Sequence, residues 1–238
     1  MPISYTDSGS PVDDGWNQVN NPFPSTIDWD LTIRNGSVNG TVAVWNTATL
    51  TYDYWDGSGN LTDGLIASGQ AFWVQTNAAG PTLTIPESAK VADVTSFLRV
   101  STETITNRLI ISLEQGSKID RTYIHFREDA TDGFDSQLDG RKLRNGIFNL
   151  STVADNETMA INALPITACN KTVPISITNI TEGAYDLVFN DIKSFNNWYD
   201  FTLHDNLLLT STPIEDGFNY SFSVIPLVFV WRIPRVYV

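Results

Sequence analysis

Apolar and polar residues alternate over many short stretches of the chain, which is the pattern of strands with one buried and one exposed face. In segment 218–224, Phe218, Tyr220, Phe222 and Val224 alternate with polar residues. The same period of two predicts further half-buried strands. These lie at 41–45, 50–54, 71–75, 82–85, 108–113, 123–126, 185–189 and 199–203.

Turn-forming pairs of Asn or Asp with Gly separate these strands, at 35–36, 56–57, 63–64, 132–133, 139–140 and 216–217. A parallel sheet would need crossover helices, and the chain has no convincing helical period. The pattern therefore predicts an all-β fold, an antiparallel β-sandwich of the jelly-roll or immunoglobulin-like type. Segment 135–143 is the one place where a short helix fits, capped by Asp135 or Ser136.

The length of 238 residues allows two packed blocks of ordinary size. A linker near 86–95 predicts a boundary after residue 94. Block 1–94 holds five of the seven Trp residues and could lack N-terminal strands, whereas block 95–238 has the size of a complete sandwich. With 42% apolar residues, the chain has enough material for a packed core.

Charge and cysteine content narrow the possible partners. The chain has 27 acidic and 14 basic residues, a net charge of −13 and a pI near 4.3. A field of this sign repels phosphate, which argues against nucleic acid and anionic lipid as partners.

Cys169 is the only cysteine, so the chain has no internal disulfide framework. No apolar run reaches the roughly 18 to 20 residues of a membrane-spanning helix, so no membrane insertion is expected.

Two acidic loops are candidate calcium sites, and calcium is the only cofactor that the sequence suggests. Asp56, Ser58, Asn60 and Asp63 present oxygen atoms at alternating positions of a Gly-containing loop, a spacing that can wrap a calcium ion. The loop lacks the Glu and the flanking helices of an EF-hand, so an ordinary hairpin turn is the alternative.

The second acidic loop contains Asp129, Asp132 and Asp135, with Glu128 and Asp139 beside them. Carboxylates at this density repel one another unless a cation, a basic side chain or hydrogen bonds compensate their charge. Calcium is one possibility. Ion pairing with neighbouring Arg residues and capping of a short helix is the other.

Aromatic side chains around residues 52–55 are candidate contacts for a sugar ring, because the apolar face of a sugar stacks on an aromatic ring. Tyr54 and Trp55 are adjacent in a predicted strand, so their side chains point to opposite sides and one of them is expected to be exposed. We therefore predict Tyr52, Tyr54 and Trp55 as ligand contacts. The alternative is that these rings pack in the core or anchor turns.

Motifs of known enzymes are missing from the sequence. His125 and His204 are the only histidines, and neither stands in a metal-binding pair or beside a nucleophile. His125 alternates with Tyr123 and Arg127 on what is expected to be a solvent-facing side of a strand. A pair of glycosidase carboxylates leaves no short motif, so this third, enzymatic alternative stays open.

Several longer motifs resemble one known group of proteins. They are GWNQVNNPFPSTIDW at 15–29, VWN at 44–46, ASGQAFWV at 67–74, FREDATDGFD at 126–135 and MAINALP at 159–165. In this order they resemble a region of large secreted proteins of the Bacteroidetes type, which lies just before the C-terminal sorting domain for type IX secretion.

The resemblance implies a β-sandwich module without assigned catalytic residues, located outside a bacterial cell or on its surface. The sorting domain itself is not in this sequence, so the chain is expected to be part of a longer parent protein. We therefore predict a non-catalytic, structural or adhesive module that contacts an extracellular protein or glycan. The alternative is a carbohydrate-binding module that uses exposed aromatic rings and is attached to a glycan-degrading enzyme.

Overall fold

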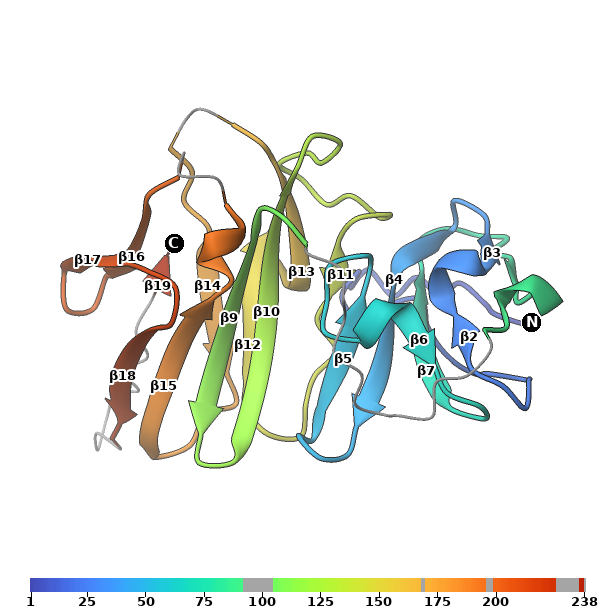
Figure 1. The fold of residues 1–238 in the computed structure, drawn as a ribbon, viewed down its shortest axis with the longest axis horizontal. Coiled ribbons are helices and arrows are strands. Elements are labelled where there is room, and N and C mark those ends of the chain that lie inside the picture. Colours follow the sequence, from blue (N-terminus) through green and yellow to red (C-terminus); the bar gives the residue numbers. More distant parts are fainter. Residues whose placement is uncertain (92–104, 168–169, 196–198, 226–235, 238) are drawn as a thin grey trace. The chain divides into compact units, whose positions relative to one another are not determined.

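The computed structural model describes residues 1–91, 105–167, 170–195, 199–225 and 236–237 (Figure 1). The described residues form strands and four short 3-10 turns, with no α-helix among them. Within this part of the chain, no helix is long and apolar enough to cross a membrane. The predicted all-β class with antiparallel sheets is confirmed.

The chain divides into two compact units. The first contains Met1–Asn46, Tyr52–Thr104 and Asp135–Gly140, and the second contains Thr47–Thr51, Ile105–Phe134 and Arg141–Val238. The boundary predicted after residue 94 lies outside the described residues.

The first unit is built on a four-stranded sheet in the order β1-β7-β4-β5, in which β7 pairs antiparallel with β1 and β4. Two short ladders, β2 with β6 and β3 with β8, complete it. The strands are β1 (Trp16–Asn20), β2 (Ile27–Asp28), β3 (Ile33–Arg34), β4 (Val38–Asn46), β5 (Thr51–Trp55), β6 (Leu65–Ile66), β7 (Ala71–Thr76) and β8 (Leu83–Thr84). The 3-10 turns are η1 (Trp29–Leu31), η2 (Thr62–Gly64) and η3 (Glu87–Ala89).

The corner after β1 is held by a buried Asn. The Asn21 side-chain amide donates to the carbonyls of Ser25, Ile66 and Ala67 at 2.8, 3.2 and 3.0 Å, and its oxygen accepts from the backbone N–H of Phe23. Asn21 thereby supplies hydrogen-bond partners for four backbone groups. The Pro-containing turn of the GWN…IDW motif is fixed by this one side chain.

Trp29, at the end of the same motif, is the largest fully buried side chain of the first unit. Its indole N–H donates to the Gly40 carbonyl at 2.6 Å, and its ring meets Phe72 edge-on at 5.9 Å between centroids. The Arg34 guanidinium lies 4.2 Å above the ring. Trp29 therefore links the short ladders to β4 and β7.

Segment 135–140 belongs to the first unit although the chain on both sides of it belongs to the second. The N–H of Gly40 donates to the Ser136 carbonyl at 2.9 Å, and the Gln137 amide donates to the Val38 carbonyl at 3.0 Å. A Cβ on Gly40 would lie 2.2 Å from the Gln137 carbonyl oxygen, so only glycine permits this approach.

The short helix predicted at 135–143 is wrong. The N–H groups of Leu138 and Asp139 both donate to the Asp135 carbonyl, which closes one turn at 136–138. The chain then extends into β11 (Gly140–Arg141). Pairing of this segment with β4 uses backbone groups that a longer helix would need for itself.

The second unit is an eleven-stranded sheet in the order β17-β16-β19-β14-β12-β13-β10-β9-β15-β18, with β11 paired to β13. Its other strands are β9 (Arg108–Gln115), β10 (Lys118–Arg127), β12 (Asn149–Ala154), β13 (Glu157–Pro165), β14 (Pro174–Thr178), β15 (Gly183–Asn190), β16 (Phe201–Asp205), β17 (Thr210–Ile214), β18 (Phe218–Val224) and β19 (Val236–Tyr237). The turn η4 spans Ile192–Ser194.

One core joins both halves of this sheet. Leu109, Ile124 and Leu187 come from β9, β10 and β15, whereas Ile175 and Leu203 come from β14 and β16 at the other end of the strand order, and all belong to one apolar cluster. The sheet therefore curls over on itself in the manner of a sandwich, as Figure 1 shows for its strands.

The strands β10 and β13 pair in parallel, with Tyr123 opposite Ile161 and Phe126 opposite Leu164. Every other ladder with a described register is antiparallel. The connection between the two strands runs through β11 and β12. A parallel pair thus forms here without the crossover helix that the sequence argument required.

A buried ion pair holds the middle of this unit. The Lys142 Nζ donates to Asp120 Oδ1 at 2.6 Å, and the other carboxylate oxygen of Asp120 accepts from the backbone N–H of Leu150 at 2.7 Å. Both charged side chains are buried. The pair therefore joins β10, the residue after β11, and β12.

Removing one partner of this pair should destabilise the fold strongly. We expect Lys142→Met to lower the free energy of unfolding by about 3–5 kcal/mol, because it leaves the Asp120 carboxylate buried and unpaired. The double variant Asp120→Asn, Lys142→Met should regain most of that loss, since Asn still accepts from Leu150. Urea unfolding followed by circular dichroism measures both. A double variant no more stable than Lys142→Met would contradict this account.

Candidate functional site

The aromatic pair predicted to contact a ligand is buried. Tyr54 is 1% exposed and Trp55 is 4% exposed, so the prediction that one of them faces solvent is wrong. The Trp55 indole N–H donates to Asp30 Oδ2 at 3.0 Å, and a Cβ on Gly64 would lie 2.6 Å from the ring. The turn η2 covers one side of β5 while the core covers the other.

Tyr52 and Trp45 are the more accessible rings of this region. Trp45 is 36% exposed, and its ring meets the half-buried Tyr52 at 4.9 Å with an angle of 68° between planes. A sugar ring stacks best on a flat aromatic surface. These two tilted rings do not form such a surface.

The first acidic loop is held by its own hydrogen bonds. Asp56 Oδ1 accepts from both the backbone N–H and the hydroxyl of Ser58, at 2.8 and 2.6 Å. Asn60 Oδ1 accepts from the Tyr54 N–H at 2.9 Å. Asp63 lies in η2 with φ 50°. These contacts are those of an ordinary Asx-stabilised hairpin loop, the alternative to a calcium site.

In the second acidic loop, basic side chains compensate two of the predicted calcium ligands. The Arg127 guanidinium donates to both oxygens of Asp129, at 2.9 and 3.0 Å, which lowers the pKa of that carboxyl. Asp132 pairs with Lys171. The N–H of Asp135 donates to Asp139 Oδ2 at 2.6 Å. Among the described residues, no group of three or more His, Cys, Asp or Glu side chains could hold a metal ion.

His125 is half-buried between two cations rather than on an open face, and its neighbour Tyr123 is buried. The expectation of a solvent-facing side at this point of β10 is wrong for Tyr123. Arg108 lies opposite His125 on β9, and Arg127 follows two residues later. Burial, with the charges of Arg127 and Arg108, lowers the pKa of His125 to about 4.

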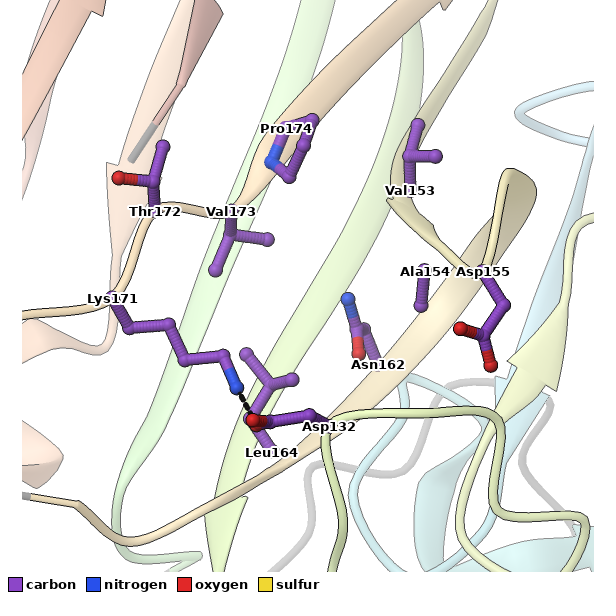
Figure 2. A pocket seen from close by; sticks show the side chains of 10 residues that line it. All are labelled: Asp132, Val153, Ala154, Asp155, Asn162, Leu164, Lys171, Thr172, Val173 and Pro174. Atoms are coloured by element: carbon purple, nitrogen blue, oxygen red, sulfur yellow. Dashed lines mark hydrogen bonds and ion pairs between the residues drawn. The ribbon is translucent and has the colours of Figure 1, made fainter.

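A small pocket lies in the second unit, between the β12–β13 hairpin and the segment before β14 (Figure 2). Its volume is about 260 Å³. We name it the Asn162 pocket. Its lining consists of Asp132, Val153, Ala154, Asp155, Asn162, Leu164, Lys171, Thr172, Val173 and Pro174.

Two charged side chains mark one side of the Asn162 pocket. Figure 2 shows the ion pair that Lys171 forms with Asp132, whose side chain is largely exposed. On the other side, Asp155 Oδ2 accepts from the Phe134 N–H at 2.8 Å. Asp155 and Asn156 both have positive φ, at 50° and 63°, which makes the hairpin tip a tight two-residue turn and fixes the place of Asp155.

Asn162 lies between these two sides and is 2% exposed. Among the described residues its side-chain amide forms no hydrogen bond, and it lines the pocket. The sequence analysis did not select Asn162, Asp155 or Lys171. A single amide inside the apolar run MAINALP was the available signal.

The described residues thus define an all-β protein of two compact units, with a small polar pocket in the second. The chain belongs to a domain family of unknown function, DUF8693, whose model matches residues 49–232. The matched region contains all the residues of the Asn162 pocket. No curated protein and no solved structure matches the chain.

The burial of Trp55 predicts a structural role that a substitution can test. We expect Trp55→Ala to lower the free energy of unfolding by about 3–5 kcal/mol, because it opens a cavity against Gly64 and removes the bond to Asp30. Trp45→Ala, the matched control at an accessible ring, should cost about 1 kcal/mol. Urea unfolding measures both, and equal losses would contradict the assignment.

The low pKa of His125 predicts a loss of stability in mild acid. The folded protein keeps His125 neutral down to about pH 4, whereas the unfolded chain protonates it below about pH 6.5. The contribution of neutral His125 to the free energy of unfolding is therefore full above pH 6.5, and it is lost as the pH falls toward 4. Between pH 7 and 4.5 the wild type should lose about 1 kcal/mol more than His125→Gln, a value discounted for partial exposure. Urea unfolding at both pH values measures this difference. An equal loss of unfolding free energy in the wild type and in His125→Gln would contradict it.

Proposed function

We propose that this chain is a non-catalytic, structural or adhesive module of a larger bacterial protein that is secreted or displayed on the cell surface. Secretion and origin rest on the motif resemblance, and the acidic charge suits a protein that stays soluble outside the cell. The role in contact rests on exposed apolar side chains of the β16–β17 hairpin.

The observation that carries the proposal is an exposed leucine tip, Leu207–Leu209, on the β16–β17 hairpin. The three side chains are 43%, 62% and 87% exposed. The tip is nevertheless ordered, because Asp205 Oδ1 accepts from the N–H groups of Leu207 and Leu208 at 2.7 and 3.0 Å. Apolar side chains presented together on a fixed turn favour binding to another protein.

The partners of the polar side chains support the same conclusion. In both acidic loops, carboxylates and amides bind their own backbone or a basic side chain, as Asp56, Asn60 and Asp129 show. Carbohydrate binding through the aromatic rings has less support, because Tyr54 and Trp55 are buried and the remaining rings are tilted.

The proposal predicts retention on an extracellular surface that depends on the leucine tip. The wild type would be passed over a panel of immobilised extracellular proteins and polysaccharides, beside Leu208→Ser, Leu209→Asn. We expect the double variant to bind a retaining surface at least about tenfold more weakly, because it removes the exposed apolar contacts. Asn tolerates the positive φ of residue 209.

Ile33→Ser is the matched control, since Ile33 is as exposed as Leu208 but lies on β3 of the first unit. It should bind as the wild type does. Equal weakening by Ile33→Ser would show that general surface hydrophobicity is responsible. Turnover of any polysaccharide in the panel would contradict the non-catalytic assignment.

A further inference from the structure

We propose that the Asn162 pocket binds one neutral sugar ring. This is a ligand site in addition to the proposed contact through the leucine tip, and it uses different residues. The inference begins with the position of Asn162. It lies on β13 opposite Ile124 and two residues before Leu164, and both of these side chains belong to the apolar core. Among the residues that the structure describes, this amide has no partner, so a ligand in the pocket can supply one.

Asn162 differs from the other unpaired polar groups in being reachable. The Asn145 amide and the Thr152 hydroxyl are also buried without partners, but they are sealed from solvent. Asn162 lines a pocket whose Asp132 side is exposed. Figure 2 shows the amide between the 153–155 strand end and the 171–174 segment. A ligand entering from solvent would therefore meet it.

The charges around the pocket favour a neutral ligand. Lys171 and Asp132 already neutralise each other, and Asp155 adds a second negative charge on the opposite side. An anion would face both carboxylates, while a cation would compete with Lys171 for Asp132. Neutral hydroxyl groups, which both donate and accept, complement the Asn162 amide, the Asp155 carboxylate and the Thr172 hydroxyl without breaking the ion pair.

The walls and the volume favour a single ring. Val153, Leu164, Val173 and Pro174 supply apolar surface for the C–H groups of a sugar. The volume of about 260 Å³ falls just below the roughly 300–1,000 Å³ of pockets that hold drug-sized ligands. The pocket therefore suits one ring, either a free monosaccharide or the terminal unit of a glycan.

Titration of the folded, full-length chain with neutral monosaccharides and their methyl glycosides tests this directly. The readout is the chemical shift of the Asn162 side-chain NH₂ in ¹⁵N NMR spectra. We expect at least one sugar class to shift this resonance in a saturable way, and Asn162→Leu to weaken the same binding at least tenfold in calorimetry. Binding of methyl glycosides alone would assign a glycan terminus, and stronger binding of free sugars would assign a monosaccharide.

The melting temperature of Asn162→Leu tests the unpaired state of the amide without any sugar present. Asn162→Leu should keep or raise the melting temperature, because it replaces an unpaired amide by an apolar side chain of similar size. The matched control is Asn149→Leu, which removes a buried amide that accepts from the Asn145 N–H at 2.7 Å. It should lower the melting temperature and leave sugar binding unchanged.

Three results would overturn the proposal. The first is the absence of any sugar-dependent shift at Asn162, which would leave water as the partner of the amide. The second is retention of sugar binding by Asn162→Leu. The third is a loss of stability in Asn162→Leu equal to that in Asn149→Leu. None of them affects the leucine tip, so binding of immobilised proteins through Leu208 and Leu209 would remain as a separate test of the contact function.

Discussion

The structure depends on hydrogen bonds to the backbone N–H and C=O groups of its many buried connections, which water does not reach. Strand ladders satisfy the strands, but every corner and loop needs another source of hydrogen bonds. Asn21 supplies it after β1, Asp120 supplies it at Leu150, and Asp14 accepts from the N–H groups of Ser8 and Ser10 near the N-terminus. Each of these side chains is buried, so loss of one would expose a dry backbone group rather than a solvated one.

Polar side chains of the first acidic loop are used in the same way. Asp56 and Asn60 look like metal ligands in the sequence, but in the fold they close their own loop. Among the described residues, two features are accessible to external partners by our proposals. They are the exposed leucines on the β16–β17 hairpin and the Asn162 amide at the margin of the core. Both features support the proposed role in binding.

Sequence patterns predicted strands well where one face of the strand meets solvent. The segment 218–224 matches β18, whose side chains alternate between half-buried and exposed along most of its length. The pattern failed at β13, where residues 159–164 are all buried and no alternation is left to detect. It failed at Trp55 because coverage by η2, whose sequence position lies seven residues later, is a tertiary effect. Asn162, the residue of the proposed ligand site, was not predicted for the same reason, since its place beside the apolar core depends on how β13 packs.

Residues 135–140 belong to the first unit, and this affects the order in which the chain folds during synthesis. Chains are synthesised from the N-terminus at about 5–20 residues per second, and domains begin to fold as they emerge. In this chain the hydrogen-bond partners of Val38 and Gly40 in β4 are Gln137 and Ser136. These partners are synthesised almost a hundred residues later. The first unit therefore spends several seconds of synthesis with an unfinished edge, and it is completed only after the first two strands of the second unit, β9 and β10, have been made. The two units are therefore interleaved in the order in which their residues are synthesised.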